Sequence, residues 1–188
     1  AELRLDAKNH WERTWKAEIG PVRELLIANG YIWAAQSDGI RRIETDYINK
    51  QIPNQWDRFS FVDGLPSSDV TALVEFKGNV AAGTVAGLSI FDGTNWSVTE
   101  LSQHNIRDLC VWKGFLVLAS NAGVYYKESS GNWAAVANAG AKVQHVCSTG
   151  QDELWLGTDS QALAFYDEAT ASWSPVTPDG PGSNTFSD

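Results

Sequence analysis

The chain has 188 residues, of which 43% are hydrophobic and 20% charged, a composition typical of one globular domain with a sizeable core. The formal net charge of −9 argues against a nucleic-acid partner, because phosphate binding requires a surplus of Lys and Arg on one face. It also argues against docking on an anionic membrane, and no apolar run approaches the length needed for membrane insertion.

Reading from the N-terminus, the first predicted element is a single strand over residues 9–18, in which Trp11 precedes the next apolar segment by 11 residues. Four repeats of one pattern follow. Their first apolar segments start at Val22, Val70, Ile106 and Val143, so the starts are separated by 48, 36 and 37 residues. Recurrence at such a period indicates a repeat architecture, which has to be recognised before any local structure is assigned.

Each repeat predicts strands rather than helices, because short segments rich in Val, Ile, Leu and aromatic residues alternate with turns of Gly, Asn, Asp or Ser. Tight hairpins are predicted between the first two segments, since those turns need positive φ angles. The turn dipeptides are Asn29-Gly30, Lys77-Gly78 and Lys113-Gly114. A glycine also stands at the entrance to the third segment, where a turn or bulge is expected. These glycines are Gly39, Gly87 and Gly123.

A tryptophan-led segment completes each repeat. The four tryptophans are Trp56, Trp96, Trp133 and Trp173. In the three later repeats the tryptophan lies 26, 27 and 30 residues after the start, whereas in the first repeat it lies 34 residues after. The first repeat therefore contains an insertion of roughly eight residues, located within residues 45–54.

Four strands in a period of 36 to 48 residues match the blade of a propeller. A sandwich would not be expected to repeat one pattern four times, and a parallel β-helix, the weaker alternative, repeats at shorter periods. We therefore predict an all-β fold, a β-propeller of about four four-stranded antiparallel blades in a single domain over residues 1–188. The inner strands should start near residues 22, 70, 106 and 143, and the outermost strands should carry the tryptophans.

Several motifs of the chain resemble the two-component-regulator propeller family. They are Asp63-Gly-Leu-Pro-Ser-Ser68, Leu154-Trp-Leu-Gly-Thr158 and Phe91-Asp-Gly-Thr-Asn-Trp96. The third repeat departs from the family pattern, with Val117-Leu-Ala-Ser120 in place of Trp-Ile-Gly-Thr. The resemblance implies propeller architecture and a bacterial-type extracytoplasmic module, periplasmic or secreted, that senses or binds.

The two ends of the chain leave the count of strands incomplete. Residues 9–18 are expected to be the outer strand of an incomplete blade, and residues 179–188 the start of a further blade or a tail. The chain could be a fragment of a larger ring, a half that partner blades complete, or a closed four-blade ring with loose ends. We favour completion by partner blades, because open blades leave unpaired sheet edges and an apolar flank.

Signals for an enzyme are poor. His10, His104 and His145 fall in different repeats and show no metal-binding spacing. The sequence has no nucleophile elbow, Walker loop or dinucleotide fingerprint. It therefore predicts no catalytic residue, no cofactor and no metal site. Cys110 and Cys147 occupy the same register in their repeats and are expected to be buried free thiols.

Ligands of propellers usually meet the face formed by loops that enter the inner strands and loops between the second and third strands. The candidate binding residues on those loops are Asp38, Asp69, Gln103, His104, Asn105 and Asp159. Trp15 and Trp112 break the repeat pattern and are candidates for a surface contact with a partner.

Two functions follow from these patterns. The first is a non-catalytic binding or assembly module, a propeller scaffold of an extracytoplasmic sensor or complex. Its partner would be a protein, either a second copy or another propeller-containing chain. The alternative is a small-molecule or glycan-binding propeller of lectin or lyase type. A lyase should gather His, Glu or Arg on its loops, and only His104 and Arg107 come close to that pattern.

Overall fold

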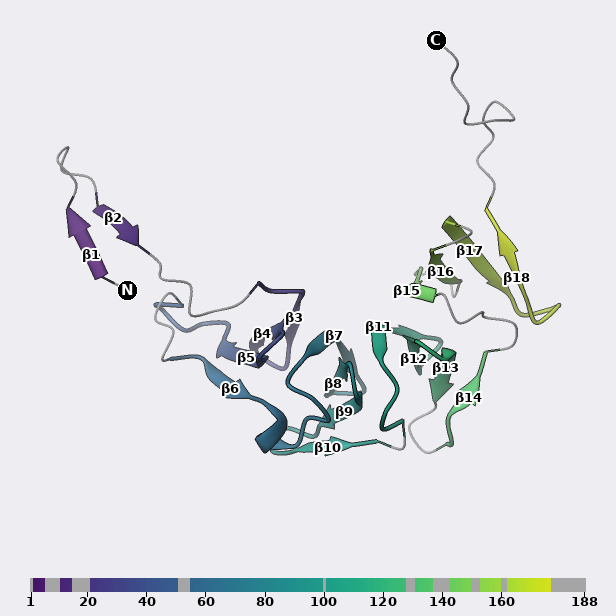
Figure 1. Ribbon diagram of the computed structural model, residues 1–188, viewed down its shortest axis with the longest axis horizontal. Helices are drawn as coiled ribbons and strands as arrows, with labels where there is room; N and C mark the ends of the chain where they lie inside the picture. Colours follow the sequence, from purple (N-terminus) through teal and green to yellow (C-terminus); the bar gives the residue numbers. More distant parts are fainter. Residues whose placement is uncertain are drawn as a thin grey trace, which may run out of the picture. The chain divides into compact units, whose positions relative to one another are not determined.

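The computed structural model (Figure 1) describes residues 2–5, 11–14, 21–50, 55–99, 101–127, 131–136, 143–149, 153–159 and 162–176. The chain divides into two compact units, residues 1–108 and 109–188. The described residues form four four-stranded antiparallel sheets and one two-stranded sheet. Each four-stranded sheet is one of the predicted repeats, so the all-β fold of about four blades is confirmed.

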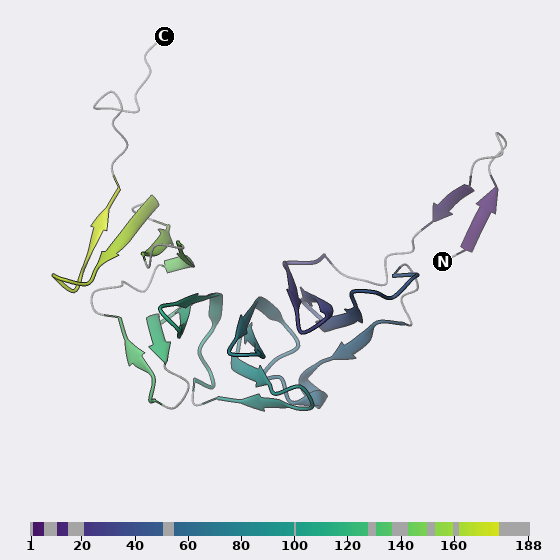
Figure 2. The same ribbon diagram turned by 180° about the vertical axis from the view of Figure 1, so that it is seen from behind.

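The first unit holds the first two blades. Blade 1 consists of β3 (Glu24–Ala28), β4 (Tyr31–Gln36), β5 (Gly39–Glu44) and β6 (Asp57–Phe59). Blade 2 consists of β7 (Val70–Phe76), β8 (Asn79–Thr84), β9 (Gly87–Phe91) and β10 (Trp96–Val98). A short 3₁₀ turn, η2 (Phe61–Asp63), connects them. Figures 1 and 2 show from opposite sides that the strands of each sheet follow one another in chain order.

The second unit holds the other two blades, whose first strand begins just before the division between the units. Blade 3 consists of β11 (Ile106–Trp112), β12 (Phe115–Ser120), β13 (Gly123–Lys127) and β14 (Ala134–Ala135). Blade 4 consists of β15 (Val143–Ser148), β16 (Leu154–Thr158), β17 (Ala162–Asp167) and β18 (Ser172–Pro175).

The strand expected over residues 9–18 is present as β2 (Trp11–Thr14), but it is not a lone strand. It pairs antiparallel with β1 (Glu2–Leu5), with Glu2 opposite Thr14. Residues 9, 10 and 15–18 lie outside the described residues, as does the further blade or tail expected over 179–188. Among the residues that the structure describes, no helix is long and apolar enough to cross a membrane.

The hairpin turns have the geometry that their dipeptides predict. Asn29 and Gly30 both adopt positive φ angles, 54° and 79°, and the two later dipeptides repeat these values closely. Positive φ at both central residues matches the right-handed twist of the flanking strands. At the entrance to β5, Gly39 has a φ of 136°. A Cβ atom there would lie 2.1 Å from the carbonyl oxygen of Phe59, so only glycine lets β6 approach.

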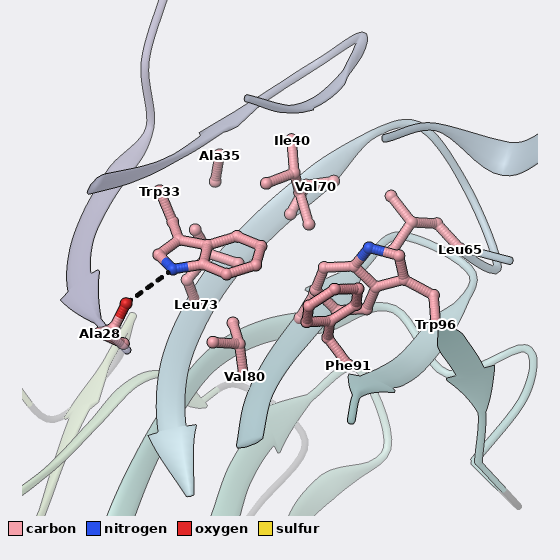
Figure 3. Close-up of a cluster of buried hydrophobic side chains, with 11 residues drawn as sticks. Ala28, Trp33, Ala35, Ile40, Leu65, Val70, Leu73, Val80, Phe91 and Trp96 are labelled. Carbon is pink, nitrogen blue, oxygen red and sulfur yellow. Dashed lines mark hydrogen bonds between the residues drawn. The ribbon is translucent and has the colours of Figure 1, made fainter. Parts of the chain in front are cut away.

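The core of the first unit lies between its two blades. Trp33 of β4, 1% exposed, donates its indole N–H to the carbonyl of Ala28 at 3.1 Å. Its ring lies 5.4 Å from that of Phe91 and 6.2 Å from that of Trp96. Figure 3 shows these rings together with Leu73. Since these side chains come from both blades, burial of apolar surface holds the blades together.

The second unit has its own core, formed by blades 3 and 4. Val117 of β12 and Leu154 of β16 are fully buried there, and β12 contacts β15. Tyr166 packs against Trp173 with the ring centroids 4.9 Å apart. The tryptophan of the fourth repeat therefore closes this core from the outer strand, as Trp96 does in the first unit.

Candidate functional site

Asp38 lies in the β4–β5 turn, where an ionic network holds it. Its carboxylate accepts a hydrogen bond from Arg41 at 3.3 Å and pairs with Arg58 at 3.2 Å. Arg41 also donates through Nε to the side-chain oxygen of Gln36 at 2.8 Å, and Gln36 is fully buried. The charge of Asp38 is thus balanced by its own blade.

Asp69 lies directly before β7 and pairs with Arg23 of the preceding blade. The same guanidinium nitrogen donates to the carbonyl of Val70 at 3.1 Å. The backbone carbonyl of Asp69 accepts from the N–H of Val85 at 3.1 Å. Asp69 therefore joins the two blades of the first unit and fixes the β8–β9 turn.

Gln103, His104 and Asn105 form the loop that leads into β11. Gln103 has a φ of 74° and donates its backbone N–H to the carbonyl of Ala86 at 2.8 Å. The side chains of Gln103 and Asn105 are exposed, and that of His104 is half-buried. Because Asp69 and Gln103 both bond to the β8–β9 turn, the structure brings these two loops to the same end of blade 2.

The other three candidate residues are Asp159, Trp112 and Trp15. Asp159 is exposed in the second unit and accepts a hydrogen bond from Gln144 at 2.6 Å. The prediction that Trp112 lies at the surface is wrong. Its side chain is 5% exposed and packs edge to face against Tyr166, 6.0 Å away, in the core of the second unit. Trp15 lies outside the described residues.

No group of three or more His, Cys, Asp or Glu residues in the described part of the chain could hold a metal ion. In the turn at Asp92, a carboxylate binds backbone N–H groups. Oδ1 of Asp92 accepts the backbone N–H groups of Thr94 and Asn95, both at 2.8 Å. The N–H groups of Asn95 and Thr94 hold the pKa of Asp92 below its usual range, since they favour the ionised form.

The first and last blades each expose an apolar surface, and each surface contains one residue whose repeat equivalents are buried. Leu25 of β3 is 65% exposed, whereas the residues at the same position of blades 2 and 4, Leu73 and Val146, are 2% and 3% exposed. Ile27, two residues along the same strand, is 72% exposed. We call Leu25 and Ile27 the first flank.

The second such surface is on the last blade. Leu163 of β17 is 51% exposed, whereas its equivalents Ile40 and Val124 are 0% and 1% exposed. Phe165, two residues further on, is also exposed, and its ring lies 5.8 Å from that of Trp155. We call Leu163 and Phe165 the last flank. Sequence reasoning predicted apolar flanks in general terms, and comparison of the repeats could have found these positions.

Comparisons with solved structures identify the fold. The chain is similar to the extracellular domain assigned to the one component system BT4673 from B. thetaiotaomicron, with a TM-score of 0.70 and 16% identity over 91% of this chain. The fold is a β-propeller. This finding agrees with the resemblance to two-component-regulator propellers. The chain spans 24% of that domain, so it matches about a quarter of its length.

Two further solved structures show the same fold. PorZ, a surface component of the type-IX secretion system of Porphyromonas gingivalis, is 20% identical over 96% of this chain and 24% of its own, with a TM-score of 0.64. Virginiamycin B lyase from Staphylococcus aureus is 11% identical over 95% of this chain and 63% of its own, with a TM-score of 0.65. No family model and no curated protein matches the chain.

Proposed function

We propose that this chain is a non-catalytic binding and assembly module of an extracytoplasmic sensor or complex. Its first and last flanks would pack against blades of a partner protein, either a second copy or another propeller-containing chain, and so complete a ring. The observation that carries the proposal is the exposure of Leu25 and Leu163 at repeat positions that are otherwise buried.

The junction between blades 1 and 2 supports the proposal, because the same repeat position is covered by a neighbouring blade there. Leu73, the equivalent of Leu25, is buried there against Ala28, Trp33 and Ala35 of blade 1. Burying a leucine side chain contributes about 1.5–3 kcal/mol. A blade placed on the first flank would bury Leu25 in the same way.

Hydrogen bonds at the inner strands repeat from one junction to the next. The side chain of the second residue of a repeat donates to the backbone carbonyl of the first residue of the next repeat. Arg23 does so to Val70 at 3.1 Å, and Thr71 does so to Ile106 at 2.8 Å. Gln144 occupies the equivalent position of blade 4. Gln144 is an amide with two N–H donors, one of which bonds to Asp159 at 2.6 Å, so this position supports a further blade next to blade 4.

The role as a sensor module and the extracytoplasmic location draw support from the solved structures. BT4673 and BT3049 are described as extracellular domains of one- and two-component systems.

Size-exclusion chromatography with light scattering tests the assembly. We expect the purified chain to form a species heavier than 20.6 kDa whose share increases with protein concentration, because association follows mass action. A monodisperse monomer of 20.6 kDa that stays stable at every concentration would overturn the proposal.

A further inference from the structure

The insertion in blade 1 builds a pocket that the repeat pattern does not require. One hollow of about 200 Å³ is lined by Tyr31, Arg42, Ile43, Glu44, Tyr47, Gln55 and Asp57. An adjoining hollow of about 350 Å³ is lined by Glu44, Asp46, Tyr47, Ile48 and Asn49. Because the two hollows share Glu44 and Tyr47, we treat them as one site, the insertion pocket. The larger hollow alone is in the range of small-ligand sites, about 300–1,000 Å³.

Specific hydrogen bonds shape the inserted segment. The backbone N–H of Thr45 donates to the carbonyl of Gly30 at 2.9 Å, which ties the segment to the β3–β4 hairpin. Nζ of Lys50 donates to the carbonyl of Tyr47 at 2.8 Å, and the indole of Trp56 donates to the carbonyl of Lys50 at 2.8 Å. Insertions confined to one repeat often form the binding face of a repeat protein.

Arg42 lines the smaller hollow with a guanidinium that is held in place by its neighbours. Its guanidinium carbon lies 4.3 Å from the centroid of the Tyr31 ring, and Nε and one terminal nitrogen both donate to Asp57, at 3.1 and 2.7 Å. The side chain is 16% exposed, so the stack and the ion pair hold it in one orientation. In the smaller hollow the guanidinium offers N–H donors.

Other residues that line the insertion pocket provide hydrogen-bond acceptors and aromatic rings. The carboxylates of Glu44 and Asp46 are exposed, and no described cation pairs with them. Gln55 adds an amide, which both donates and accepts. The rings of Tyr31 and Tyr47 line the same space and offer apolar faces with a polar tip.

The charges of the pocket select among ligand classes. Glu44 and Asp57 line the smaller hollow together with Arg42, and Glu44 and Asp46 line the larger one. The carboxylates therefore outnumber the guanidinium, so an anion is repelled. A cation would meet the guanidinium of Arg42. A neutral polyol suits both the guanidinium and the carboxylates, because a hydroxyl can accept a hydrogen bond from Arg42 and donate one to Glu44. From this balance we propose that the insertion pocket binds a neutral saccharide.

Saturation-transfer NMR and calorimetry test this on the full chain. The probes are cellobiose, maltotriose and N,N′-diacetylchitobiose, with glucosamine and glucuronate as charged comparison sugars. We expect at least one of the three neutral sugars to bind with a dissociation constant at or below about 10 mM, a weak but measurable affinity. Glu44→Gln and Tyr47→Ala should each weaken binding about tenfold or more, the loss of one good contact to a charged or aromatic group. Glu75→Gln, an exposed change on β7, serves as the matched control.

Three results would overturn the proposal. One is the absence of binding by all three sugars. Another is binding that both pocket variants leave unchanged, which would place the sugar elsewhere. The third is a preference for glucosamine or glucuronate, which would assign the pocket to a cation or an anion. The proposal does not depend on the assembly of blades, since every lining residue belongs to blade 1 or its insertion.

Discussion

Replacing Leu73 by Ala removes a side chain that is 2% exposed at the junction between blades 1 and 2. Truncation of a buried leucine costs the lost transfer free energy and leaves a cavity, together about 2–5 kcal/mol. Leu25 occupies the same repeat position but is 65% exposed. At concentrations where the chain is monomeric, Leu25→Ala should therefore change the free energy of unfolding by no more than about 0.5 kcal/mol.

Urea unfolding followed by tryptophan fluorescence measures both variants, because Trp33 lies in the core that Leu73 helps to form. At concentrations where the flanks are occupied, the cost of Leu25→Ala should rise toward that of Leu73→Ala, since Leu25 would then be buried. The reasoning is refuted if Leu73→Ala costs no more than Leu25→Ala at low concentration. A cost of Leu25→Ala that stays small at every concentration would contradict burial of the first flank.

Two further predictions concern turns. Gly39→Ala should destabilise the first unit by at least about 1–3 kcal/mol, because a Cβ would lie 2.1 Å from the carbonyl oxygen of Phe59 and φ is positive. Thermal unfolding checks this. Gly78→Ala is the control, because a Cβ there meets no atom within 4 Å. Since the pKa of Asp92 is lowered in the folded state, its stabilising effect should be present above its ordinary pKa and be lost as the pH falls below about 4. Asp92→Asn should flatten that part of the pH–stability profile, and an unchanged profile would contradict the role of the two N–H donors.

The blades could be predicted from the sequence because their turns carry local signals. Asn29 and Gly30 adopt positive φ, which this dipeptide favours locally, so the hairpin and its register follow from the dipeptide. The pairing of β1 with β2 was missed, since residues 2–5 share no motif with the repeats. A strand without turn signals finds its partner only through the fold around it.

Side-chain environments were harder to predict. Trp112 breaks the repeat, yet it is buried, because the end of β11 turns its indole toward Tyr166. Cys147 was expected to be buried like Cys110, but it is exposed. Exposure depends on which surface covers a strand, and the sequence pattern of one repeat does not contain that information.

The candidate site, too, was predicted only in part from the sequence. The loops around Asp69 and Gln103 were predicted, and the β8–β9 turn does bring them to one end of blade 2. The insertion pocket was not predicted, although the insertion itself was visible. Its shape depends on the bond from Trp56 to Lys50 and on the stack of Arg42 on Tyr31, which are contacts between segments rather than local patterns.

The molar mass of Leu163→Glu in solution, measured by light scattering beside that of Val98→Glu, tests the central claim most directly. Both side chains are 51% exposed, but Val98 lies on the outer strand β10 and belongs to neither flank. A buried unpaired carboxylate is strongly unfavourable, so Leu163→Glu should reduce the chain to a 20.6 kDa monomer while Val98→Glu keeps the heavier species. Equal masses for the two variants would contradict the account of the flanks.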